Sequence, residues 1–189
     1  MRLDWRRQIA RTMSRGATDL AGSYAAGVAI HRLVGDQVRI TSESFKDGQP
    51  MPVAHSVDGD GALPPLHISD VPARAVSLAI ASHDPDVPRD RRPDGNFDHW
   101  VVWNIPATTT IIEDAESHGG VVGRNTAGTN AWYPAGPPPG SGPHRYYFTL
   151  YALDTELDLP DDTTRADLEA AIDGHVIESA QIMGTYERT

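Results

Sequence analysis

From Val38 onward, short runs of β-branched and aromatic residues alternate with Gly, Pro and Asp. Runs of this kind predict strands joined by tight turns, and they leave little room for long helices. The two clearest runs are residues 99–105, which hold two tryptophans, and residues 145–153, which carry aromatic side chains on both faces. We therefore expect a mostly β protein, an antiparallel β-sandwich with a few short helices.

Two further segments are expected to be strands of this sandwich. Residues 38–44 form a β-type run directly after a region rich in Ala and Gly. In residues 75–82, apolar side chains occupy every second position, at Val76, Leu78 and Ile80. This alternation predicts a strand with these three side chains on one face.

The last third of the chain contains a helix signal. Thr164 and Asp167 have the spacing of a capping box and predict a short helix near residues 164–173. A last strand is expected from Val176. Residues 113–142 are rich in Gly, Pro and Asn, and they are too long for an idle connection, so we expect them to be functional or packed on the body.

The first residues differ from the rest. Residues 1–15 carry an apolar side chain at every fourth position among several arginines, which predicts a short amphipathic helix. Packing of its apolar stripe on the acidic domain or on a second subunit is favoured over contact with a membrane. We therefore divide the chain into an N-terminal helical extension (1–37) and one domain (38–189).

Charge and cysteine content exclude several classes of function. The net charge of −10 disfavours binding to nucleic acid or to anionic membranes. The absence of Cys excludes disulfides, zinc–thiolate sites and thiol nucleophiles. No apolar run is long enough for a transmembrane helix, and no secretory signal is evident, so the cytoplasm is the expected location.

The first chemical motif follows the run at residues 75–82. Pro85 and Pro88 stiffen the backbone around Asp84 and Asp86, which holds two carboxylates at the end of a strand. An ordinary turn that ends the strand is an equally simple interpretation. His99 opens the next strand, either as a site residue or as a buried histidine with a structural partner.

A second motif begins with a Pro- and Gly-rich loop at residues 137–142 and continues into His144, Arg145 and Tyr146. The backbone amides of the loop and the His144 imidazole are suited to cradle an oxyanion. Arg145 is suited to hold a carboxylate such as Asp84. A surface turn with a structural ion pair stays open as the alternative.

Other chemistry finds little support. Asp84, Asp86, His99 and His144 are residue types that bind metals, but their spacing is not typical of any metal site, so we expect neither a metal nor a cofactor. The sequence contains no serine-hydrolase elbow, no phosphate-binding loop and no dinucleotide-binding motif.

In order and combination, six motifs of the domain resemble the phosphatidylethanolamine-binding protein family, also called the Raf kinase inhibitor protein family, and in particular its bacterial and archaeal branch. They are Ser44–Gly48, Pro64–Leu66, Asp84–Pro88, His99–Asn104, Gly136–Pro138 and His144–Tyr146. The resemblance extends from about Val38 to the end of the chain.

This resemblance implies a β-sandwich with a small pocket for phosphate-like or carboxylate-like groups. It places the family's pocket residues at Asp84, Asp86, His99, Pro137, Pro138, His144 and Tyr146. To these the second motif adds Arg145 as a candidate ligand-binding residue.

The function we expect is a non-enzymatic binding or regulatory module for a phosphate, a phospholipid head group or a carboxylate. Two alternatives stay open, an inhibitor of a kinase or protease that acts through loops beside the pocket, and an enzyme that uses the Asp and His residues for acid–base chemistry on a small metabolite. A protein partner and a homodimer are also compatible with the sequence.

The carboxylates suggest a binding mechanism. If Asp84 or Asp86 accepts a hydrogen bond from an imidazole, it fixes the tautomer and favours the protonated ring. The opposite nitrogen of His99 or His144 is then expected to donate to the ligand. Affinity for phosphate should in that case rise as the pH falls.

Overall fold

The computed structural model describes residues 37–189, so the helix expected at residues 1–15 lies outside the described residues. The described elements are β1 (Arg39–Thr41), β2 (Gln49–Pro50), a short 3-10 helix (Val53–His55), β3 (Leu66–Ser69), β4 (Ser77–Asp84), β5 (Phe97–Pro106), β6 (Ile111–Ile112), β7 (Val121–Val122), β8 (His144–Leu153), α1 (Arg165–Ala171) and β9 (Val176–Tyr186). β1 is shorter than the strand expected at residues 38–44. In the described part of the chain, no helix has the length and apolar character needed to cross a membrane.

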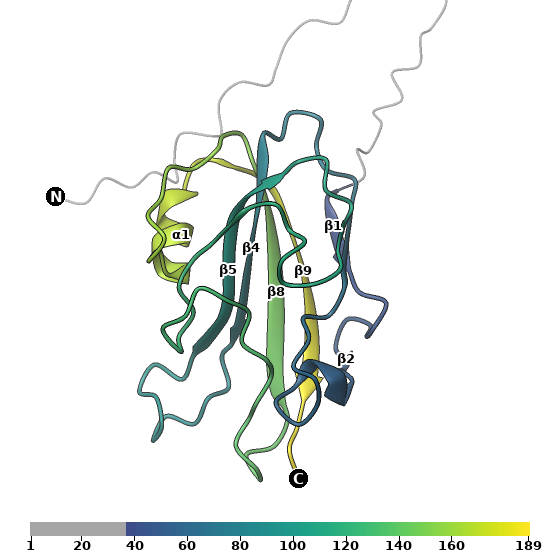
Figure 1. The fold of residues 1–189 in the computed structure, drawn as a ribbon, viewed down its shortest axis with the longest axis vertical. Helices are drawn as coiled ribbons and strands as arrows, with labels where there is room; N and C mark the ends of the chain where they lie inside the picture. The colour runs from purple at the N-terminus through teal and green to yellow at the C-terminus, as the bar shows by residue number, and fades with distance from the viewer. Residues whose placement is uncertain (1–36) are drawn as a thin grey trace, which may run out of the picture. The chain divides into compact units, whose positions relative to one another are not determined.

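The strands form two sheets, which Figure 1 shows from one side. The larger sheet has the order β2-β9-β8-β4-β5-β7, and the smaller one has the order β1-β3-β6. Every neighbouring pair is antiparallel except β2 and β9. Buried side chains of both sheets, among them Ile68 and Leu150, belong to one core. The expected mostly β sandwich is therefore confirmed.

Both faces of strand β4 are buried. Leu78 and Ile80 lie in the core between the sheets, as the alternation predicted. Ala79 faces the other way and packs with Leu168 of α1 in a second core. Val76 precedes the strand and is 50% exposed. The alternation alone did not predict that the second face is also buried, since a helix distant in sequence covers it.

Helix α1 begins where its capping signal predicted. The Thr164 hydroxyl accepts a hydrogen bond from the Asp167 amide, and the Asp167 carboxylate accepts one from the Thr164 amide. This reciprocal pairing satisfies two amide groups that the first turn of a helix leaves free. Leu168 is fully buried, so the helix is held against the large sheet by a short apolar contact.

The long loop expected at residues 113–142 is fixed to the sandwich. It contains only the two-residue strand β7 and an isolated bridge. The Trp132 indole donates to the Gly61 carbonyl at 3.0 Å, and the Tyr133 amide donates to the His99 carbonyl at 3.0 Å. These bonds bring the end of the loop to the start of β5, where the candidate site lies.

Candidate functional site

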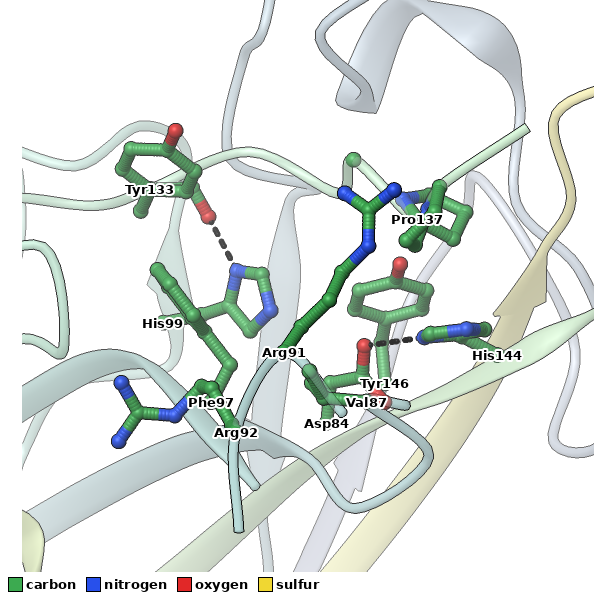
Figure 2. Close-up of a pocket in the computed structure, with 12 residues that line it drawn as sticks. Asp84, Val87, Arg91, Arg92, Phe97, His99, Tyr133, Pro137, His144 and Tyr146 are labelled. Carbon is green, nitrogen blue, oxygen red and sulfur yellow. Dashed lines mark hydrogen bonds and ion pairs between the residues drawn. The ribbon is translucent and has the colours of Figure 1, made fainter. Parts of the chain in front are cut away.

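Segments far apart in the sequence meet at one end of the large sheet. β4 ends there, and β5 and β8 begin there, because β4 runs antiparallel to both. The end of the long loop closes over these strand ends. Together they enclose a cavity of about 250 Å³, drawn in Figure 2. Its lining residues are Asp84, Val87, Arg91, Arg92, Phe97, His99, Tyr133, Gly136, Pro137, Pro138, His144 and Tyr146.

Strand alternation places two of the predicted residues in the cavity. His144 and Tyr146 are two residues apart on β8, so they lie on one face of the sheet. That face continues into the core between the sheets, through Phe148 and Leu150. Asp84 lies at the end of the neighbouring strand and lines the same cavity.

A β-bulge brings His99 to this face. Ser82 of β4 pairs with Trp100 and His83 pairs with Asp98, so β5 carries one extra residue between these two positions, and that residue is His99. Asp98 points to the other face, where the Arg165 side chain of α1 donates to it at 2.6 Å. Regular alternation would place His99 with Val101 and Trp103 on the helix-covered face. The bulge redirects it into the cavity, a common use of bulges beside functional sites.

The hydrogen bond of His99 fixes its tautomer. Its Nδ1 lies 2.7 Å from the Tyr133 carbonyl oxygen, which only accepts, so Nδ1 carries the proton. Nε2 is buried and has no hydrogen-bond partner. Burial lowers the pKa of His99 from its usual 6.5 to about 4, although the Tyr133 carbonyl opposes the shift. In the neutral ring, Nε2 is therefore a bare acceptor.

His144 is held by a carboxylate, as the sequence suggested. Its Nδ1 donates to Asp84 Oδ2 at 2.7 Å, and both side chains are buried. Asp84 also accepts a bond from the Asp86 amide at 2.8 Å. Burial raises the pKa of Asp84, and the hydrogen bond from His144 opposes this rise.

The other nitrogen of His144 has a partner within the protein. Its Nε2 lies 3.0 Å from the Ser141 hydroxyl. The expected arrangement, a histidine between a carboxylate and the ligand, is therefore not present at either position. The second nitrogen of His144 is occupied by Ser141, and His99 is oriented by a carbonyl instead of an aspartate.

Tyr146 has a buried hydroxyl without a hydrogen bond. The side chain has no solvent exposure, and its ring makes an edge contact with His99, with the centroids 5.2 Å apart. Burial raises its pKa well above the usual value, and the neighbouring charge of Asp84 adds to this effect. Tyr146 therefore keeps its proton, and its hydroxyl can donate a hydrogen bond to a ligand.

Asp86 and Arg145 are paired with each other and do not line the cavity. The Arg145 side chain donates from Nη2 to Asp86 Oδ1 at 2.6 Å and from Nε to Oδ2 at 2.8 Å. This pairing holds the pKa of Asp86 below its usual value. The pair ties the loop after β4 to the start of β8, and so it shapes the cavity from outside.

Six lining residues were not predicted as site residues, although two of them, Val87 and Gly136, lie within motifs noted in the sequence. The six are Val87, Arg91, Arg92, Phe97, Tyr133 and Gly136. In Figure 2 the Arg91 side chain reaches across the cavity towards Pro137. It is exposed and makes no side-chain hydrogen bond or ion pair with any residue in the 37–189 segment. The one signal for it was a cluster of arginines in residues 89–92 of an acidic chain.

The chemistry of this cavity suits a small polar group. It offers one hydroxyl donor, one bare imidazole acceptor, a buried carboxylate and an arginine at the mouth. No three His, Asp or Glu side chains are grouped as metal ligands anywhere in residues 37–189.

Comparison with known proteins places the chain in a family. Residues 41–187 match the model of the phosphatidylethanolamine-binding protein family. A UPF0098 protein of Chlamydia trachomatis is 43% identical over 152 residues, which cover 80% of this chain and 99% of that protein. A UPF0098 protein of Methanothermobacter thermautotrophicus is 38% identical over 157 residues, with coverage of 80% and 99%.

Solved structures agree with this match. The crystal structure of a putative phosphatidylethanolamine-binding protein homolog from Chlamydia trachomatis has a TM-score of 0.77 and 41% identity, and it covers 81% of this chain and 99% of that one. E. coli YbcL, described as a new member of the mammalian family, has a TM-score of 0.73 and 29% identity with the same coverage. The chain belongs to the phosphatidylethanolamine-binding protein family.

Proposed function

We propose that this chain is a non-enzymatic binding protein for a small oxyanionic group, either a phosphate or a carboxylate. The observation that carries the proposal is a pair of buried polar atoms without partners, His99 Nε2 and the Tyr146 hydroxyl. Both belong to residues that line one cavity. Buried polar atoms are nearly always hydrogen-bonded in native proteins, so two free atoms in one cavity indicate a ligand that completes them.

The charge at the mouth of the cavity supports an anion. Arg91 and Arg92 line it, and Arg91 has no carboxylate partner in the described part of the chain. The protein as a whole carries a formal charge of −10 and repels anions on average, so a free arginine at this point attracts an anion locally. Arginine also matches the planar geometry of carboxylate and phosphate oxygens.

The size of the cavity limits the ligand. At about 250 Å³, it lies at or below the lower end of typical ligand pockets, which begin at roughly 300 Å³. A head group or a single acidic side chain fits such a space, and a whole lipid does not. The family is described as binding phosphatidylethanolamine, in which the phosphate is a diester, so binding of a free phosphate monoester would differ from binding of that lipid.

Calorimetry with inorganic phosphate and with acetate tests the proposal. Removing one exposed arginine contact in Arg91→Ala should weaken binding about three- to tenfold, more at low salt than at high salt. Arg74→Ala is the matched control, because Arg74 is also exposed and lies just before β4, at the end of the strand opposite Asp84. Absence of binding by the unaltered protein, or equal losses in both variants, would contradict the proposal.

A second candidate is hydrolysis of an ester, and one observation favours it. Ser141, His144 and buried Asp84 are hydrogen-bonded in the order that activates a serine nucleophile. It ranks second because the Ser141 hydroxyl also lies 2.7 Å from the Pro138 carbonyl, which competes for its proton. Release of p-nitrophenol from p-nitrophenyl acetate should fall in Ser141→Ala if this candidate holds, and equal rates would remove it.

A further inference from the structure

We propose that the cavity selects an oxyanion that carries its own proton, such as the monoanion of a phosphate monoester, over a diester or a sulfate ester of equal charge. The inference rests on the proposed function and specifies the ligand class. It follows from the hydrogen-bonding capacity of the residues that line the cavity, two of which present fixed acceptors.

The first fixed acceptor is His99. Its Nδ1 proton is committed to the Tyr133 carbonyl at 2.7 Å, so the neutral ring presents only a lone pair at Nε2. That atom is buried and has no partner in the protein. A ligand oxygen without a proton would place its own lone pair against this one, and the two would repel each other. A ligand hydroxyl group would donate to it and complete the ring.

The groups around His99 keep it neutral. From β4 these are His83 and Asp84, from β5 Asp98, from β8 His144 and Tyr146, and from the loops Tyr133 and Arg91. Asp98 is paired with Arg165 on the other face of the sheet, and Asp84 is paired with His144, so neither carboxylate is free to hold an imidazolium at this position. Burial adds to this, since it lowers the pKa of His99 to about 4.

The second fixed acceptor is Asp84. Its carboxylate lines the cavity and already accepts bonds from His144 and from the Asp86 amide. An approaching oxyanion is repelled by this carboxylate unless the facing oxygen carries a proton. Against these two acceptors stand two donors, the Tyr146 hydroxyl and the exposed Arg91 guanidinium. A monoprotonated phosphate satisfies both kinds of partner, because it offers one hydroxyl group and three other oxygens.

The test compares three probes that carry one negative charge: methyl phosphate as its monoanion, dimethyl phosphate and methyl sulfate. Only the first has a hydroxyl group. Calorimetry on the full chain at pH 5.5 should show methyl phosphate binding at least about tenfold more tightly than the other two, as for a site that loses a ligand hydrogen-bond donor.

The same probes separate titration of the ligand from titration of the protein. With a second pKa of about 6, the monoanion of methyl phosphate becomes about 25-fold scarcer between pH 5.5 and 7.5, so its apparent affinity should fall by that factor. Dimethyl phosphate does not titrate in this range. Its pH dependence therefore reports any titration of the protein, and the ratio of the two affinities isolates the proton of the ligand.

A variant links the effect to His99. His99→Gln replaces the fixed acceptor with an amide that can also donate, so the preference for methyl phosphate over dimethyl phosphate should shrink to less than about threefold. The comparison of probes on the unaltered protein stands even if this variant fails to fold. Equal affinity for all three probes would overturn the inference and leave oxyanion binding intact. Binding of methylammonium with no binding of any anion would overturn both.

Discussion

Removing the Tyr146 hydroxyl should make the empty protein more stable and the ligand complex weaker. The hydroxyl is buried and has no partner, while the ring packs against His99 and the core. A buried unpaired polar group costs about 1–3 kcal/mol. With the lower end of that range, Tyr146→Phe should gain about 1 kcal/mol, or about 2–4 °C in melting temperature.

The same substitution should weaken binding. A hydrogen bond to a charged partner contributes about 1.5–3 kcal/mol, which corresponds to an affinity about 10- to 150-fold lower for methyl phosphate in Tyr146→Phe. Thermal unfolding without ligand and calorimetry at pH 5.5 measure the two effects on the same sample. The opposite signs of the two changes are the signature of a group kept for function at a cost in stability.

Tyr147→Phe is the matched control. Tyr147 is the next residue of β8, points to the opposite face and accepts a 3.2 Å bond from the exposed Arg145. Its loss should change stability by less than about 0.5 kcal/mol and leave the affinity unaltered. A lower melting temperature in Tyr146→Phe with unchanged affinity would refute the reasoning, because the hydroxyl would then be a structural group.

Three other substitutions test separate parts of the structure. Burial lowers the pKa of His99 to about 4, so the stability that its neutral ring contributes is full above pH 6.5 and is lost as the pH falls towards 4. Between pH 7 and pH 4.5, the free energy of unfolding measured in urea should therefore fall by about 2 kcal/mol less in His99→Gln than in the unaltered protein. Gly123→Ala should lower the free energy of unfolding by about 2 kcal/mol in the same assay, because its Cβ would lie 2.4 Å from the Thr163 carbonyl oxygen. Arg145→Lys should change phosphate affinity by less than about twofold in calorimetry, because Arg145 binds Asp86 outside the cavity.

The sequence predicted those parts of the fold that depend on local patterns. The strand at residues 145–153 and the capping box at Thr164 are found where expected, because alternation and capping are decided within a few residues. The common face of His144 and Tyr146 follows from the same period of two. The second buried face of β4 could not be predicted, because it depends on α1, which follows about 80 residues later in the chain.

The orientation of His99 shows the limit of local reasoning at the site. Alternation from Val101 and Trp103 places its side chain under α1, and only the resemblance to a family suggested a place in the pocket. The bulge that turns it depends on how β5 pairs with β4, and a bulge of this type leaves no residue signature such as a Gly. The Ser141 contact with His144 was also missed, because it depends on the conformation of a loop.

The bulge and the free polar atoms are best understood together. A regular strand would bury the His99 ring against Trp103 and Leu168, an apolar environment without the Tyr133 carbonyl that now orients it. At the bulge, His99 is not paired with a residue of β4. Its imidazole is oriented by the Tyr133 carbonyl, and its second nitrogen has no partner. Folding alone gains nothing from that nitrogen, because an unpaired buried acceptor is a cost. A ligand proton at Nε2 removes this cost, so stronger binding of a proton-bearing oxyanion and a more stable liganded protein are two consequences of the same contact.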